Sequence, residues 1–181
     1  AVDKKTIKRS PPPPFITSTL QQEGARKLGF SSKKTMQLAQ QLYEGVDIGG
    51  ETKALITYMR TDSVNLSDDC ITSVRKLIND MYGEKYLPST PTKFKSKVKN
   101  AQEAHEAIRP VDVSILPESL TGKIDASLLK LYTLIWKRTV ACQMSKADNY
   151  RTQLTLSSSD KKHDLRATGT MLVFDGFLKV Y

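Results

Sequence analysis

The spacing of apolar residues predicts helices through the middle of the chain. Apolar side chains recur every three or four positions after Ser31, Ser67 and Asp125, and each of these polar residues can cap a helix N-terminus. Ser18 begins a capping-box pattern that predicts one more helix, which a glycine ends. The pattern therefore predicts four main helices, the longest of which runs from Asp125 to about Cys142.

Both ends of the chain have a different pattern. Beyond Asn149 the apolar period changes from 3.6 to 2, which predicts a strand over residues 150–157. After a polar turn, residues 165–167 and 171–174 also have strand-like composition. At the N-terminus, the four prolines of residues 11–14 predict a stiff extended connector, because proline continues neither a helix nor a sheet ladder.

The two ends can share one sheet, with the helices lying between them in the sequence. The predicted fold class is therefore α+β, with a mainly helical domain inserted into a β-strand domain. In this arrangement residues 1–16 and 147–181 form the β part, and residues 17–146 form the helical part.

Composition and charge narrow the possible functions. The 181 residues are 39% hydrophobic, which is ordinary for a globular protein, but 28 basic against 19 acidic side chains give a net charge of +9. Such an excess predicts a polyanionic partner: nucleic acid, an acidic membrane surface or an acidic protein. The sequence has no apolar run of membrane-spanning length. Its first methionine is Met36, and we expect the chain to be a segment of a longer protein.

The two cysteines do not suggest a metal or redox site. Cys70 and Cys142 form no C-x-x-C pair, and both lie in apolar helical stretches. We expect them to be buried, reduced thiols. The sequence also lacks a D-x-D, an EF-hand pattern, a Walker loop and a dinucleotide-binding glycine motif, so no metal ligand is predicted in it.

The densest polar cluster runs from Thr57 to Ser63. In an extended chain Tyr58, Arg60 and Asp62 project from one face. A guanidinium presents a planar fork of donors to a phosphodiester and favours a nearby phenolate, so this pair suits phosphate chemistry. The alternative is a tyrosine at a strand end beside an arginine that forms a surface ion pair.

A second cluster lies between Gln102 and Pro110 and contains His105. The sequence has Arg109 where a zinc-protease helix needs a second histidine, so that site is excluded. His105 can serve as a phosphate donor or proton relay, and the alternative is a capping or surface histidine. Asn100 can cap a short helix that Pro110 ends. The preceding basic loop either contacts a nucleic-acid backbone or is a solvated face; its alternating lysines are Lys93, Lys95, Lys97 and Lys99.

The segment Leu55–Ser63 resembles the active-site tyrosine motif of bacterial DNA topoisomerase I, the type IA family. Four further segments resemble the family in the same order along the chain. They are Pro14–Gln22, Gln102–Pro110, Leu131–Gln143 and Phe174–Phe177.

The resemblance implies a role for each polar cluster. Tyr58 would attack a single-strand phosphodiester and hold the 5′-phosphate, Arg60 would stabilise that phosphate, and His105 would bind or protonate in the DNA site. Strand passage and religation would then relax negative supercoils without ATP. The residues expected to contact DNA are Arg60, Thr61, Asp62, Ser63, Lys93, Lys95, Lys97 and Lys99.

The resemblance also implies partners and a cofactor. The expected partners are single-stranded DNA, negatively supercoiled duplex DNA and the remaining domains of the same enzyme, in the bacterial cytoplasm at the nucleoid. The family's Mg²⁺-binding Toprim domain has no counterpart in this sequence. We therefore expect that the chain binds no metal of its own and is inactive alone. Residues 1–16 and 147–181 would belong to the family's hinge-like arch.

Two alternatives remain. Tyrosine recombinases and type IB enzymes have H-x-x-R before the tyrosine, whereas His105 and Arg109 form H-x-x-x-R after Tyr58. A non-catalytic nucleic-acid-binding module would use the lysines and the basic N-terminal third without needing the tyrosine.

Overall fold

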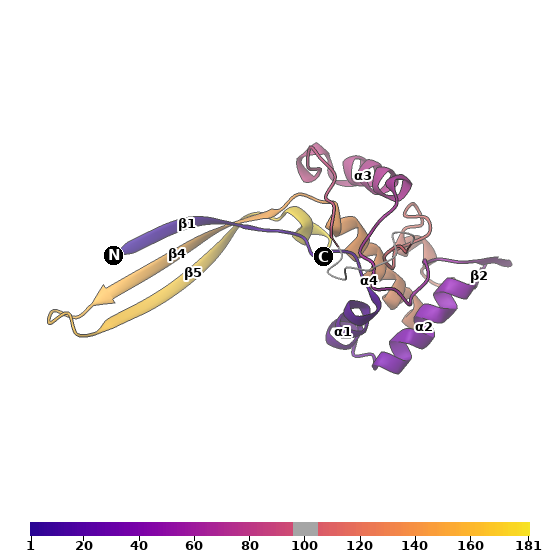
Figure 1. Ribbon diagram of the computed structural model, residues 1–181, viewed down its shortest axis with the longest axis horizontal. Helices are drawn as coiled ribbons and strands as arrows, with labels where there is room; N and C mark the ends of the chain where they lie inside the picture. Colours follow the sequence, from indigo (N-terminus) through magenta and orange to yellow (C-terminus); the bar gives the residue numbers. More distant parts are fainter. Residues whose placement is uncertain (96–104) are drawn as a thin grey trace.

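The computed structural model describes residues 1–95 and 105–181. It consists of a helical body from which a long, narrow β arm projects (Figure 1). The elements are β1 (Val2–Arg9), α1 (Thr17–Leu28), α2 (Ser32–Glu44), β2 (Val46–Ile48), β3 (Glu51–Lys53), α3 (Asp68–Tyr82), η1 (Glu84–Tyr86), η2 (Pro117–Leu120), α4 (Ala126–Cys142), β4 (Ala147–Ser157), β5 (Asp164–Phe174) and η3 (Gly176–Lys179).

The arm is an antiparallel sheet with the strand order β1-β4-β5. Val2 lies opposite Leu154 in the β1–β4 register, so the predicted sharing of one sheet by the two chain ends is confirmed. β5 is one continuous strand, whereas the sequence predicted two short stretches. The intervening Gly169 pairs with Thr152 of β4, and this pairing maintains the strand through a glycine.

Three of the four main helices begin where their capping residues predicted. The side chains of Ser31 and Ser67 accept hydrogen bonds from backbone N–H groups in the first turns of α2 and α3. Asp125 does the same for α4, which ends at Cys142 as expected. These side chains satisfy N–H donors that have no partner within the helix.

The first helix starts two residues earlier than predicted. Its N-cap is Ile16 rather than Ser18, because the hydroxyl of Thr19 accepts a hydrogen bond from the Ile16 N–H at 3.0 Å. Its C-terminus follows the prediction: Gly29 adopts a left-handed conformation with φ of 68°, which glycine takes without steric cost.

Helix α4 forms the centre of the core and contacts α1, α2 and α3. Its Leu131 and Ile135 are fully buried. Two large polar side chains of the same helix each reach a backbone carbonyl: the Tyr132 hydroxyl donates to Ile115 at 2.6 Å and the Trp136 indole to Val113 at 2.9 Å. The long loop that precedes α4 is thereby attached to the core.

Arg138 joins the helical body to both chain ends. Its guanidinium donates to the Pro13 carbonyl at 2.6 Å and to the Tyr181 hydroxyl at 2.8 Å, and it lies 4.5 Å from the Phe15 ring centroid. α1 begins at Thr17 and β4 at Ala147, the positions where the predicted helical and β parts divide. The division into two domains stays a prediction.

One predicted helix is wrong in the part that the structure describes. Asn100 lies outside the described residues, but residues 105–110 contain no helix and instead form two isolated antiparallel bridges. Ile108 pairs with Phe15, and Pro110 pairs with Ile56. Long-range backbone pairing therefore replaces the local helical preference. In the described part of the chain, no helix has the length and hydrophobicity required to cross a membrane.

Candidate active site

The tyrosine segment, residues 55–63, lies between the start of α1 and residues 105–111. Its three apolar residues, Leu55, Ile56 and Met59, are each only 1% exposed. The Val111 N–H donates to the Leu55 carbonyl at 3.0 Å, which continues the pairing of Ile56 with Pro110. The segment has little regular secondary structure, but its apolar side chains anchor it to the core.

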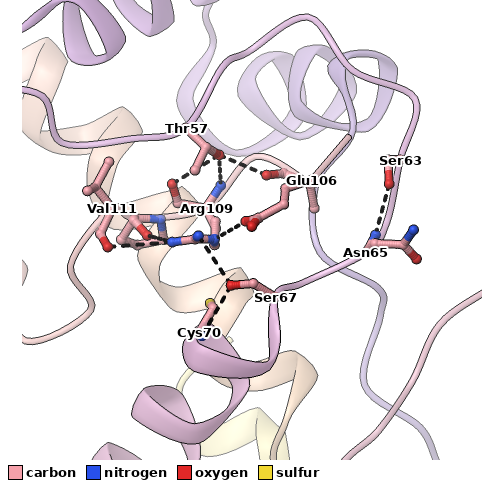
Figure 2. Close-up of polar contacts among 10 residues, drawn as sticks. Thr57, Ser63, Asn65, Ser67, Cys70, Glu106, Arg109 and Val111 are labelled. Atoms are coloured by element: carbon pink, nitrogen blue, oxygen red, sulfur yellow. Dashed lines mark hydrogen bonds and ion pairs between the residues drawn. The ribbon is translucent and has the colours of Figure 1, made fainter. Parts of the chain in front are cut away.

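Thr57, the residue immediately before Tyr58, is hydrogen-bonded to residues 107 and 109 (Figure 2). Its N–H donates to the Arg109 carbonyl at 2.9 Å, and its hydroxyl accepts from the Arg109 N–H at 3.0 Å. The same hydroxyl donates to the Ala107 carbonyl at 2.8 Å. The side chain and the backbone of Thr57 are thus both bonded to the neighbouring segment.

Thr17 holds the residues on the other side of Tyr58. Its hydroxyl donates to the Met59 carbonyl at 2.7 Å and accepts from the Thr61 N–H at 2.9 Å. Its own N–H donates to the Thr61 carbonyl at 3.0 Å. Thr17 and Thr57 therefore secure the backbone on both sides of Tyr58, and three segments far apart in the sequence meet there.

Alternate residues of the tyrosine segment are exposed, which agrees with the predicted common face of Tyr58, Arg60 and Asp62. Tyr58, Arg60 and Asp62 are exposed, whereas Met59 and Ser63 between and after them are buried. The Tyr58 side chain is 47% exposed. Among the described residues, no hydrogen bond or ion pair joins Arg60 to Tyr58. The Tyr58 phenol is thus exposed, while buried neighbours and the hydrogen bonds of Thr17 and Thr57 hold its backbone.

The Tyr58 ring rests edge-on against Tyr43 of α2, with ring centroids 5.3 Å apart and planes inclined by 63°. Such an edge contact is a favoured aromatic geometry and limits how the ring can rotate. The sequence offers no signal for this partner, because Tyr43 lies on a separate helix and follows only the helical pattern.

Two residues predicted to contact DNA, Thr61 and Ser63, use their hydroxyls in hydrogen bonds to the local backbone. The Thr61 hydroxyl accepts from the Ser63 N–H at 3.1 Å. The Ser63 hydroxyl accepts from the Asn65 N–H at 3.2 Å (Figure 2). Ser63 is fully buried. The hydroxyls shape the exit of the tyrosine segment, and their contact with DNA stays a prediction.

Arg109, for which the sequence predicted no role, forms a network of polar contacts beside the tyrosine segment. Its guanidinium pairs with Glu106 at 2.5 Å, donates to the Pro110 carbonyl at 3.0 Å and reaches the Ser67 hydroxyl at 3.5 Å (Figure 2). Burial is the largest single effect and acts to lower the pKa of Arg109. The hydrogen bond and the charge of Glu106, together with the nearby Cys70, act against it, and the pKa of Arg109 is raised. The three-residue spacing of Glu106 and Arg109 was the available signal for this pair.

The structure places the remaining predicted residues near this junction to different extents. His105 is exposed, and two residues later the Ala107 N–H donates to the Asn65 carbonyl at 2.8 Å. Lys93 and Lys95 are exposed and lie outside any helix or strand, and Phe94 between them is half-buried. Their contact with DNA stays a prediction. Lys97 and Lys99 lie outside the described residues.

The described residues contain no group of three histidine, cysteine or acidic side chains that could hold a metal ion. The two cysteines are free and buried, as predicted. Burial raises the pKa of Cys142 to about 12 and also raises the pKa of Cys70, so both thiols stay protonated at neutral pH.

Known proteins and a family model match this chain along nearly its whole length. A family model described as DNA topoisomerase matches residues 1–181. The chain belongs to the DNA topoisomerase family. Proteins named DNA topoisomerase 1 from Rickettsia bellii and Xylella fastidiosa are 61% identical over 180 residues and 51% identical over 181 residues. In both cases the match covers 99% of this chain and 22% of the relative.

A solved structure shows the same arrangement of elements. Full-length topoisomerase I from Thermotoga maritima is 42% identical, with a TM-score of 0.87, over 99% of this chain and 28% of the solved one. The chain thus spans 22% of the length of the Rickettsia bellii relative and 28% of the solved Thermotoga maritima chain.

Proposed function

We propose that this chain is the tyrosine-bearing part of a type IA DNA topoisomerase, which breaks and rejoins one DNA strand. The observation that carries the proposal is the outward-facing phenol of Tyr58 on a backbone held from both sides by Thr57 and Thr17. A fixed nucleophile lowers the entropic cost of reaching the geometry for attack.

In the proposed step, the Tyr58 oxygen forms a bond to phosphorus and the bond from phosphorus to the 3′ oxygen breaks. The phenol loses its proton, and the departing 3′ oxygen gains one and becomes a hydroxyl. The 5′-phosphate then remains on Tyr58. The reverse reaction restores the strand, and no ATP is needed because the phosphotyrosine retains the bond energy.

Arg60 and His105 supply the accompanying charges and proton transfer. Arg60 is exposed on the same face as Tyr58, where its guanidinium would bind the phosphate oxygens. His105 would bind the phosphate or protonate the leaving oxygen. Thr61, Asp62, Ser63 and the lysines at 93, 95, 97 and 99 would position the strand by backbone contacts.

The complete reaction requires more than this chain. Passage of a strand through the break would relax negatively supercoiled DNA, in the cytoplasm at the nucleoid. Mg²⁺ would be held by a Toprim domain elsewhere in the enzyme, since the described residues offer no matching ligand cluster. The isolated chain would therefore neither cleave nor relax DNA.

The test uses a chimaera in which this chain replaces the matching segment of the Rickettsia bellii enzyme, with which it is 61% identical. Tyr58→Phe should abolish relaxation of supercoiled plasmid on a gel. Tyr150→Phe is the matched control, because Tyr150 on the arm is 46% exposed against 47% for Tyr58. Full relaxation by the Tyr58→Phe chimaera would refute the proposal and favour a binding module.

A further inference from the structure

A large groove lies at the root of the β arm, apart from the tyrosine segment. It has a volume of about 710 Å³ and is lined by residues from β1, β4 and β5 and by the loop of residues 88–92. This is the region where the arm meets the helical body (Figure 1). The volume is within the range of clefts that hold small ligands.

Three lysines from three different elements give this groove its charge. Lys8 comes from β1, Lys85 from η1 and Lys146 from the turn before β4, and all three are exposed. Within the part of the chain that the structure describes, none of them forms an ion pair. One carboxylate, Asp148, also lines the groove, so a net positive charge remains.

Aromatic rings lie beside these charges. Lys85 Nζ lies 4.6 Å from the Phe174 ring centroid, and Phe174 lines the groove. Phe94 lines it as well and is half-buried. Lysines interleaved with aromatic rings are typical of surfaces that bind single strands, where ammonium groups meet phosphates and rings stack on bases.

The groove is connected to the tyrosine segment by shared walls. Thr92 and Phe94 line both this groove and a smaller cavity of about 170 Å³. The smaller cavity is also lined by Lys93, by the carboxylate-bearing Asp68 and by Asn65, which lies two residues after the tyrosine segment. The two adjoining cavities thus extend from the root of the arm to the residues that follow the tyrosine segment.

We propose that this arm-root groove binds the backbone of single-stranded DNA through Lys8, Lys85 and Lys146. The proposal rests on the proposed function, because it names a second contact for the same substrate. It assigns a role to three lysines outside the 93–99 loop and to the junction between arm and body.

The test measures the binding of this chain to a fluorescent oligo-dT of about 12 nucleotides, a length within the range of single-strand binding sites. The variant is Lys8→Gln/Lys85→Gln/Lys146→Gln. The control is Lys33→Gln/Lys123→Gln/Lys162→Gln, which removes equal charge from exposed lysines outside the groove. Fluorescence anisotropy gives Kd at several salt concentrations, and thermal melting verifies that both variants are folded.

The groove variant should weaken binding about tenfold at low salt and lower the salt dependence, the slope of log Kd against log salt, by about 2. The control should leave both quantities close to those of the unsubstituted chain. Equal effects of the two variants, or no binding by the unsubstituted chain, would overturn the proposal. Equally tight binding of a duplex, with the same loss in the groove variant, would overturn the single-strand assignment.

This outcome is separate from that of the proposed function. Oligo-dT binding by the groove variant reports on the groove, whereas plasmid relaxation by the Tyr58→Phe chimaera reports on the chemistry. If the groove variant binds oligo-dT as tightly as the unsubstituted chain while the Tyr58→Phe chimaera cannot relax DNA, only the groove proposal is refuted. If the groove variant loses binding while the Tyr58→Phe chimaera relaxes DNA fully, only the proposed chemistry is refuted.

Discussion

The β arm and the tyrosine segment combine order and burial in opposite ways. The arm is regular, yet β5 is exposed along almost its whole length, and Leu165 on it is 73% exposed. The tyrosine segment is irregular, yet Leu55, Ile56 and Met59 are 1% exposed. Regular secondary structure is therefore no guide to which region is fixed by the core.

The difference shows how a reactive side chain can be both exposed and well placed. Threonine hydroxyls hold the backbone on both sides of Tyr58, and buried neighbours anchor it, while the phenol itself stays outward. In the arm, each strand is held mainly by its ladder hydrogen bonds. Substitutions of buried residues in the helical body should accordingly lower the free energy of unfolding much more than substitutions in the arm.

The largest difference in stability is expected between two leucines. Leu131→Ala in α4 removes a fully buried side chain and should lower the free energy of unfolding by about 2–5 kcal/mol. Leu165→Ala on the arm should change it by less than about 0.5 kcal/mol. Urea denaturation followed by circular dichroism measures both, and equal losses would contradict the comparison.

A smaller difference is expected between two threonines. Thr57→Val leaves the Arg109 N–H and the Ala107 carbonyl without their partner and should cost about 1–3 kcal/mol. Thr168→Val on the exposed strand β5 is the matched control and should be close to neutral. The same denaturation measurement applies. A neutral Thr57→Val would show that the hydroxyl does not hold the tyrosine segment.

The smallest expected difference is in how Glu23 of the body and Asp160 of the arm affect the pH dependence of stability. Burial disfavours the charge of Glu23 on α1, but hydrogen bonds from Arg26 and Tyr181 outweigh burial and lower its pKa from 4.5. A carboxylate with a lowered folded pKa stabilises the fold above its unfolded pKa, and this stabilisation is lost as pH falls through the folded value. Stability should therefore fall as the pH drops below about 4.5, the value in the unfolded chain.

Glu23→Gln should flatten this acid dependence. Asp160 in the arm turn also has a lowered pKa, through hydrogen bonds from Ser158 and the Lys162 backbone. Asp160 is exposed to solvent, so Asp160→Asn should flatten the profile less. Thermal melting from pH 3 to pH 7 compares the two variants, and a larger effect of Asp160→Asn would reverse the expected order.

Local patterns predicted much of this architecture. The caps at Ser31, Ser67 and Asp125 and the alternation after Asn149 depend on neighbouring residues only, and the structure confirms each of them. The exposed face of the tyrosine segment also followed from its alternation along an extended chain.

The contacts that build the site could not be predicted in this way. Thr17 bonds to residues more than 40 positions away, and residues 105–110 pair with Phe15 and Ile56 rather than forming the predicted helix. Such pairings depend on the tertiary arrangement, which overrides local preference. The ring contact of Tyr58 with Tyr43 likewise depends on where α2 packs.

The most direct test of the account traps the covalent intermediate in the Rickettsia bellii chimaera. A single-stranded oligonucleotide labelled at either its 3′ or its 5′ end is incubated with enzyme and Mg²⁺ and then denatured. The account predicts that only the 3′ label stays on the protein, because the downstream fragment is held by its 5′-phosphate, and that mass spectrometry locates it on Tyr58. Retention of the 5′ label, or an adduct that persists in Tyr58→Phe, would contradict the account.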